Sequence, residues 1–232
     1  MSKEKYTHII MIIDSSGSME TIKSDMEGGF NNFIDKQKKI DGKATMTLTT
    51  FNSDIDIEFT NKDLTEVDNL KLNPKGMTAL LDAIGMTLNK ERERIMSMDS
   101  DEKPEKVICV IITDGAENSS KKHSREEIFE MISSLENEKE DTKWNFVFLG
   151  ANQDAIQTGG SIGTQPYRSL TYDASSEGAT VAFSSLSNAT VQYRCSNDSK
   201  AEYTFDQKDR DAQEKIKNNP IPNYISNLSG SQ

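Results

Sequence analysis

The feature that most constrains the fold of this chain is an unbroken apolar run, residues 107–112 (VICVII), which is followed at once by Thr-Asp-Gly. A strand with one face in water alternates apolar and polar side chains, so a continuous apolar run indicates a strand that is buried on both faces. Such strands are typical of parallel sheets that helices cover on both sides. Residues 7–13 and 144–149 have a similar character, which predicts several strands of this kind in one sheet.

Helical patterns separate these strands. Apolar residues recur at helical spacing in four segments, residues 22–34, 79–98, 124–135 and 175–193, and shorter elements are expected at residues 153–162 (helix) and 169–172 (strand). Residues 44–51 and 55–59 are predicted to form a hairpin, whose alternating outer strand suits a sheet edge. Alternating strands and helices predict an α/β fold: a doubly wound, Rossmann-like, mostly parallel sheet with one antiparallel edge strand and helices on both faces.

The length of 232 residues predicts one domain with an appendage. We place the domain at residues 1–195 and a polar tail at residues 196–232. The tail has scattered apolar residues such as Phe205, and Pro220 and Pro222 interrupt regular structure. We therefore expect it to be loosely ordered and dispensable for folding.

Composition excludes several classes of function. The net charge of −11 disfavours binding to nucleic acid or to an anionic membrane surface, because both require clustered positive charge. No apolar run approaches the roughly 18 residues of a membrane span, and the first one is too short for a signal sequence. These features favour a cytoplasmic protein.

Thiol and imidazole chemistry are also disfavoured. Cys109 lies in a predicted buried strand and Cys195 lies near the polar tail, so a disulfide framework is not expected. His8 and His123 are the two histidines, and no Cys/His cluster has the spacing of a zinc site. We expect His8 to be packed or hydrogen-bonded inside the sheet and His123 to be a solvated loop residue.

Oxygen-bearing side chains follow two of the predicted strands and open one helix. Ligands of open α/β sheets bind beyond the carboxyl ends of the strands, so these side chains should meet there. An all-oxygen set suits a hard cation such as Mg²⁺, and Mn²⁺ and Ca²⁺ are also compatible with it. The predicted metal-site residues are Asp14, Ser16, Ser18, Thr78 and Asp114.

Each of these segments alone has a simpler interpretation. Residues 14–18 could form a turn before a helix, Thr78 a helix N-cap, and Asp114 with Gly115 a common turn. Their combination favours the metal site. Nearby polar residues are assigned other roles: electrostatic tuning for Glu20, Glu117 and Asn118, protection of a sheet edge for Asp54, Asp56 and Glu58, and a helix-start carboxylate for Asp154.

The segments Asp14-Ser15-Ser16-Gly17-Ser18, Gly76-Met77-Thr78 and Thr113-Asp114-Gly115 together resemble the metal-ion-dependent adhesion site of von Willebrand factor type A domains, in the stand-alone cytoplasmic form found in bacteria and their phages. The resemblance runs from about residue 7 to residue 150. It implies that Ser16, Ser18 and Thr78 ligate the metal directly, with Asp14 and Asp114 behind them. It also implies that an Asp or Glu of a partner protein completes the metal's coordination.

The sequence therefore predicts a non-enzymatic, metal-dependent protein-binding module. One alternative is a Mg²⁺-dependent phosphohydrolase of the haloacid-dehalogenase type, which needs a second Asp two residues after Asp14, where this chain has Ser16. A Walker phosphate-binding loop is absent as well. The other alternative, a structural subunit of a larger assembly, overlaps with the first function.

Overall fold

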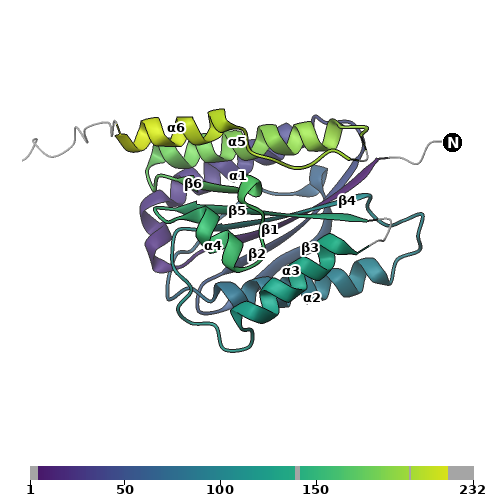
Figure 1. Ribbon diagram of the computed structural model, residues 1–232, viewed down its shortest axis with the longest axis horizontal. Coiled ribbons are helices and arrows are strands. Elements are labelled where there is room, and N and C mark those ends of the chain that lie inside the picture. The colour runs from purple at the N-terminus through teal and green to yellow at the C-terminus, as the bar shows by residue number, and fades with distance from the viewer. Residues whose placement is uncertain (1–4, 139–141, 199, 219–232) are drawn as a thin grey trace, which may run out of the picture.

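The computed structural model describes residues 5–138, 142–198 and 200–218 and contains a six-stranded sheet with the strand order β3-β2-β1-β4-β5-β6 (Figure 1). β3 is antiparallel to β2 and forms one edge, whereas the other neighbouring strands are parallel. The strands are β1 (Tyr6–Asp14), β2 (Lys43–Phe51), β3 (Ile55–Asp63), β4 (Lys106–Thr113), β5 (Lys143–Ala151) and β6 (Ser169–Tyr172).

Helices cover both faces of the sheet. α1, α5 and α6 lie on one face, and α2, α3 and α4 lie on the other (Figure 1). The helices are α1 (Lys23–Gln37), α2 (Leu80–Met96), α3 (Arg125–Asn137), α4 (Ala155–Ser161), α5 (Ser176–Cys195) and α6 (Gln207–Asn218), with short 3-10 turns at Gly17–Ile22, Leu64–Glu66 and Pro166–Arg168. The predicted α/β fold class is confirmed.

The sheet divides the core into two layers. In β1, Ile9, Met11 and Ile13 face α1 and α5, whereas Ile10 and Ile12 face α2 and α3. All five side chains have no exposed surface. An unbroken apolar run is thus what a strand at this position requires, because both of its faces are covered.

The sheet order creates a switch point beside β1. The chain leaves β1 toward β2 on one side and later returns to place β4 on the other side. Loops that follow β1 and β4 therefore diverge at the carboxyl edge of the sheet, and a crevice between such loops is where open α/β sheets place their ligands.

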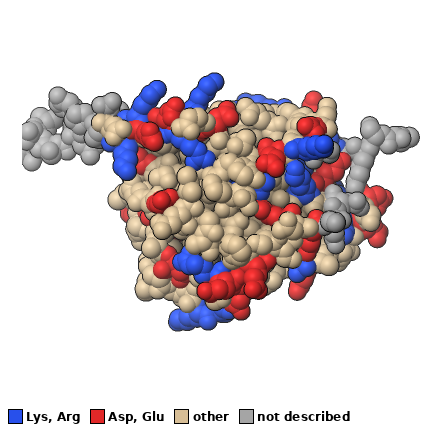
Figure 2. All heavy atoms as spheres, in the orientation of Figure 1, with Lys and Arg blue, Asp and Glu red and all other residues tan. Residues whose placement is uncertain are grey.

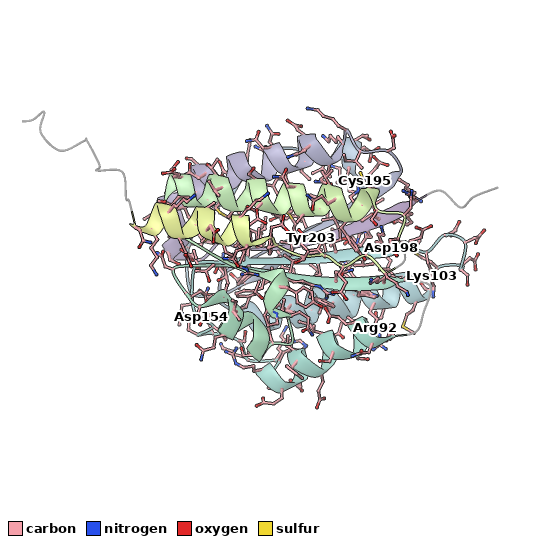
Figure 3. All side chains as sticks on the ribbon, turned by 45° about the horizontal axis from the view of Figure 1, so that its top comes forward. Arg92, Lys103, Asp154, Cys195, Asp198 and Tyr203 are labelled. Carbon is pink, nitrogen blue, oxygen red and sulfur yellow. The ribbon has the colours of Figure 1, made fainter. Side chains whose placement is uncertain are left out.

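The expectation of a loosely ordered tail is wrong for residues 200–218. Tyr203 is fully buried against α5, where its hydroxyl donates to the Leu186 carbonyl (3.2 Å), and Phe205 is also part of the core. Figure 3 labels Tyr203 on the segment that connects α5 to α6. Two buried aromatic side chains, together with hydrogen bonds from residues such as Lys143 and Arg210, attach this polar segment to the domain, so its low apolar content was misleading. Residues 219–232, including Pro220 and Pro222, lie outside the described residues.

The sequence also predicted the environment of the two histidines, His8 and His123. His8 is fully buried, with Nδ1 2.7 Å from Thr45 Oγ1 and Nε2 3.1 Å from a Glu91 oxygen, so the expected packed and hydrogen-bonded role is confirmed. His123 is not a solvated loop residue, because its side chain is only 16% exposed and packs against Gly85 of α2. Among the described residues, no helix is long and apolar enough to cross a membrane.

Candidate metal site

The loop that follows β1 is held tightly to the body of the sheet. Asp14 ends the strand and has no exposed surface, and its Oδ1 accepts a 2.7 Å hydrogen bond from the Ser16 backbone amide. The Ser15 amide donates to the Phe51 carbonyl of β2 at 2.6 Å. These bonds turn the backbone so that Ser16 and Ser18 fall on the same side, with their hydroxyl oxygens 3.2 Å apart.

Backbone hydrogen bonds join a second loop, the one that precedes α2, to the loop that follows β1. The Gly17 amide donates to the Gly76 carbonyl (3.2 Å), and the Lys75 amide donates to the Ser15 carbonyl (2.9 Å). Gly76 has a φ of +70°, a conformation that favours glycine, and the loop then delivers Thr78 to the site, 3% exposed. The alternative role of Thr78 as a helix N-cap does not apply, because α2 begins at Leu80.

The third loop follows β4 and ties the other two together. Thr113 Oγ1 donates to Asp14 Oδ2 at 2.6 Å, and Ser18 Oγ donates to Asp114 Oδ1 at 2.7 Å. Gly115 comes next, and a Cβ built on it would lie 3.0 Å from Thr78 Oγ1 and 3.8 Å from both Asp14 Oδ2 and Ser18 Oγ. Oxygens from three loops thus converge beside Gly115. The structure brings together all five residues that the sequence analysis grouped.

The five candidate metal-site residues range from fully buried to exposed. Asp14, Ser16 and Thr78 are buried, Asp114 is half-buried, and Ser18 is exposed. The group is therefore closed on the side of the sheet and open to solvent at Ser18. An ion held here would be reachable by a group from another molecule.

The electrostatics of the site fit a cation. Burial raises the pKa of Asp14, and the nearby Asp114 carboxylate raises it further; burial also raises the pKa of Asp114. In the described residues, no basic side chain is hydrogen-bonded or ion-paired with either carboxylate. Burying negative charge without a positive partner is unfavourable, and a bound cation would supply that partner.

The donor set fits a hard cation rather than zinc or another soft metal. No group of three or more His, Cys, Asp or Glu side chains that could hold a metal ion occurs in the described part of the chain. The five converging residues contain only two carboxylates, and their other donors are hydroxyls. Hydroxyl and carboxylate oxygens are ligands that Mg²⁺ accepts, whereas thiolates and imidazoles are absent from the site.

Two neighbouring residues hold the loops in place, a role that the sequence analysis missed. Asn118 Oδ1 accepts a 2.9 Å hydrogen bond from the Thr78 amide. Glu117 accepts hydrogen bonds from the amides of Leu81, Ser119 and Ser120. The contacts of Asn118 with Thr78 and of Glu117 with Leu81 join residues 40 and 36 positions apart, and local sequence patterns give no signal for such contacts.

Other expectations about nearby carboxylates can be compared with the structure. Asp154 accepts hydrogen bonds from the amides of Ile156 and Gln157 at the start of α4, which confirms it as a helix-start carboxylate. Asp54 precedes the antiparallel edge strand β3, and Asp56 and Glu58 lie on it.

Comparison with known proteins identifies the fold. No family model matches the sequence, and no curated protein matches it. Proximal thread matrix protein 1 from the mussel byssus aligns with a TM-score of 0.57 and 18% identity over 81% of this chain and 46% of that chain. A von Willebrand factor type A structure from Catenulispora acidiphila aligns with a TM-score of 0.52 and 14% identity over 80% of this chain and 42% of that chain.

The chain therefore has a von Willebrand factor type A-like fold. It spans less than half the length of the two chains to which it is compared. At these identities the likeness concerns the fold, and the site rests on the geometry described above.

Proposed function

We propose that this protein is a non-enzymatic binding module that holds a divalent cation, Mg²⁺ in the first instance, and through it binds an acidic residue of a partner protein. The observation that carries the proposal is the convergence of hydroxyl and carboxylate oxygens beside Gly115. Ser16, Ser18 and Thr78 would hold the cation directly, with Asp14 and Asp114 behind them.

The chemistry of these side chains favours capture of an anion. When bound, the cation supplies a local positive charge and a coordination position for a carboxylate. Hydroxyl ligands are neutral, so they leave much of that charge uncompensated. Asp14 is engaged by Ser16 and Thr113, which keeps its carboxylate turned toward the loops. The exposed Ser18 side of the site is where a partner's carboxylate would enter.

The residue two positions after Asp14 argues against the phosphohydrolase alternative. General acid–base catalysis of that type needs a carboxylic acid two residues after Asp14, and that position carries the Ser16 hydroxyl instead. Loss of a general acid alone costs about 10²–10⁴-fold in rate. We therefore expect no Mg²⁺-dependent phosphatase or ATPase activity that depends on Asp14.

Metal binding tests the proposal directly. Calorimetric titration with Mg²⁺ and with Mn²⁺ should show one site in the wild-type protein and none in the Ser16→Ala/Ser18→Ala variant, whose altered hydroxyls lie in a loop outside the core. Asp114→Asn should weaken binding at least tenfold, whereas Asp56→Asn, an exposed carboxylate on β3, should leave it unchanged. Equal binding by the wild type and the double variant would refute the site.

A further inference from the structure

A pocket with a volume of about 680 Å³ opens where β5 and β6 end. Residues 152–154 after β5 line one part of it, residues 170–173 of β6 and the following loop line another, and α6 closes the remaining side. A volume of this size lies within the range of about 300–1,000 Å³ that is usual for ligand sites. Nothing in the proposed metal site accounts for this pocket.

The pocket and the candidate metal site share the carboxyl edge of the sheet. Thr113 of β4 is paired with Gly150 of β5, and Ala151 is paired with Tyr172 of β6, so Asp114 is level with the strand ends that line the pocket. Neighbouring strands are about 4.8 Å apart, which places the pocket roughly 10 Å along the edge from the metal site. The two sites are close enough for one short segment to contact both.

Electrostatics agree with this proximity. Tyr172 lies in the pocket lining and is fully buried, which raises the pKa of its hydroxyl. The negative charges of Asp114 and Asp14 raise it further. The pocket floor therefore lies within the electrostatic reach of both site carboxylates.

The pocket combines one exposed apolar side chain with polar and charged neighbours. Ile156 of α4 is 43% exposed there, one of few large apolar side chains in the described residues with so much exposed surface, whereas the lining residues Leu170 and Tyr172 are each only 1% exposed. Figure 2 shows few charged side chains over α4, whereas charges gather over α6 above it and over α3 below it. Charges of both signs line the pocket, with three acidic and two basic side chains, so neither sign dominates strongly: Asp154, Asp173, Glu214, Arg210 and Lys217.

We propose that this pocket binds an apolar side chain of the same partner segment whose acidic residue enters the candidate metal site. The proposal rests on the proposed function, and it specifies the partner as an extended peptide segment. An extended chain rises about 3.3 Å per residue, so a span of roughly 10 Å corresponds to an apolar residue about three positions from the acidic residue. The apolar contact supplies the selectivity that a carboxylate alone lacks.

Short synthetic peptides test this arrangement. Two series carry one Leu and one Glu separated by zero to six Gly residues, in both orders and with blocked ends, and matched series carry Ala in place of Leu. Binding in Mg²⁺ is measured by chemical-shift changes of backbone amides. With spacers of one to three Gly residues, the Leu peptides should bind about tenfold more tightly than the Ala peptides and should shift the amides of residues 152–154.

Variants separate the two contacts. Ile156→Gln, which adds no charge near the metal site, should remove the preference for Leu without changing Mg²⁺ affinity. Met96→Gln is the matched control, because Met96 is 52% exposed at the far end of α2. EDTA and the Ser16→Ala/Ser18→Ala variant should abolish binding of every peptide in the series.

The peptide experiments separate failure of the pocket proposal from failure of the proposed metal-dependent function. Peptides that bind in Mg²⁺ but show no preference for Leu at any spacing would overturn the pocket proposal and leave the proposed function standing. A preference for Leu that persists in EDTA would contradict both the shared segment and the proposed function. A preference that emerges only when residues 219–232 are removed would mean that this chain fills its own pocket, which also overturns the proposal.

Discussion

Glu91 and Asp14, two fully buried carboxylates of this protein, differ in their partners. Glu91 has no exposed surface, and its oxygens are paired with Arg94 at 2.6 Å and with His8 at 3.1 Å. Asp14 is equally buried, and together with Asp114 it has no basic partner in the described residues. The carboxylate that stabilises the fold is thus neutralised by the chain itself, whereas the pair at the sheet edge leaves room for an external cation.

The pairing of Glu91 predicts how stability depends on pH. Although burial opposes ionisation, the hydrogen bonds from His8 and Thr47 and the positive charge of Arg94 hold the pKa of Glu91 at about 2, below its ordinary value of 4.5. A lowered folded-state pKa stabilises the protein fully above the unfolded pKa, and this contribution is lost as the pH falls from about 4.5 toward 2.

Glu91→Gln tests this dependence. At pH 7 it should lower the free energy of unfolding by about 3 kcal/mol, because the Arg94 and His8 side chains lose a buried charged partner. The difference between the variant and the wild type should shrink as the pH falls below 4.5. Urea unfolding at pH 7, 5, 4 and 3 provides the measurement, and a difference that does not change with pH would show that Glu91 is not ionised in the folded protein.

Gly115 carries the most local prediction about the site. A Cβ at this position would lie 3.0 Å from Thr78 Oγ1, so Gly115→Ala should displace that hydroxyl and weaken Mg²⁺ binding about tenfold while the protein stays folded. Gly28→Ala in α1 is the control, because a Cβ there meets nothing within 4 Å. Unchanged Mg²⁺ affinity in Gly115→Ala, measured by calorimetry, would mean that Thr78 does not take part.

At the scale of elements, aromatic side chains pack the segment that connects α5 to α6 against the domain. Tyr203 packs edge-on against Tyr193 and Phe205, with ring centroids 5.9 Å away in both cases. α6 itself is polar, and its one buried residue, Gln213, bonds to the Asp173 amide and the Gly178 carbonyl. Arg210 of the helix also donates to the Ser169 and Pro166 carbonyls, so α6 is held by polar contacts and the preceding segment by aromatic packing.

Tyr203→Ala should lower the free energy of unfolding by about 3–5 kcal/mol, as expected for the loss of a fully buried aromatic side chain. Glu202→Ala, at the exposed neighbouring position, should change it by less than about 0.5 kcal/mol. Chemical unfolding of both variants gives the comparison. If both behave like the wild type, residues 200–218 do not contribute to the core.

Sequence patterns predicted the elements with strong periodicity and missed the contacts between distant segments. The continuous apolar run at residues 107–112 located β4, since burial on both faces leaves a direct signature. Tyr203 gave no such signature, because an isolated aromatic residue in a polar stretch reaches the core only through its tertiary position. The hydrogen bond by which Asn118 holds the Thr78 loop was missed for the same reason, because Thr78 is 40 residues away.

At the scale of the whole molecule, the strand order determines where chemistry can occur. β1 and β4 are neighbours at the centre of the sheet, and their carboxyl ends supply Asp14 and the loop that carries Asp114. The paired β5 and β6 end at the same edge and line the pocket. The amino-terminal edge has a different role: the ammonium groups of Lys106 and Lys143 donate there to backbone carbonyls of residues 193, 196 and 201 and hold the end of α5 and the segment after it.

The most direct test of the central claim is the position of a bound metal. Crystals of the protein grown in millimolar Mn²⁺ and measured near the manganese absorption edge would show each ion as an anomalous difference peak. The account predicts one peak within about 2.0–2.4 Å of the hydroxyl oxygens of Ser16, Ser18 and Thr78, and its loss in the Ser16→Ala/Ser18→Ala variant. A peak elsewhere with none at these oxygens, or a peak that remains in the variant, would contradict it.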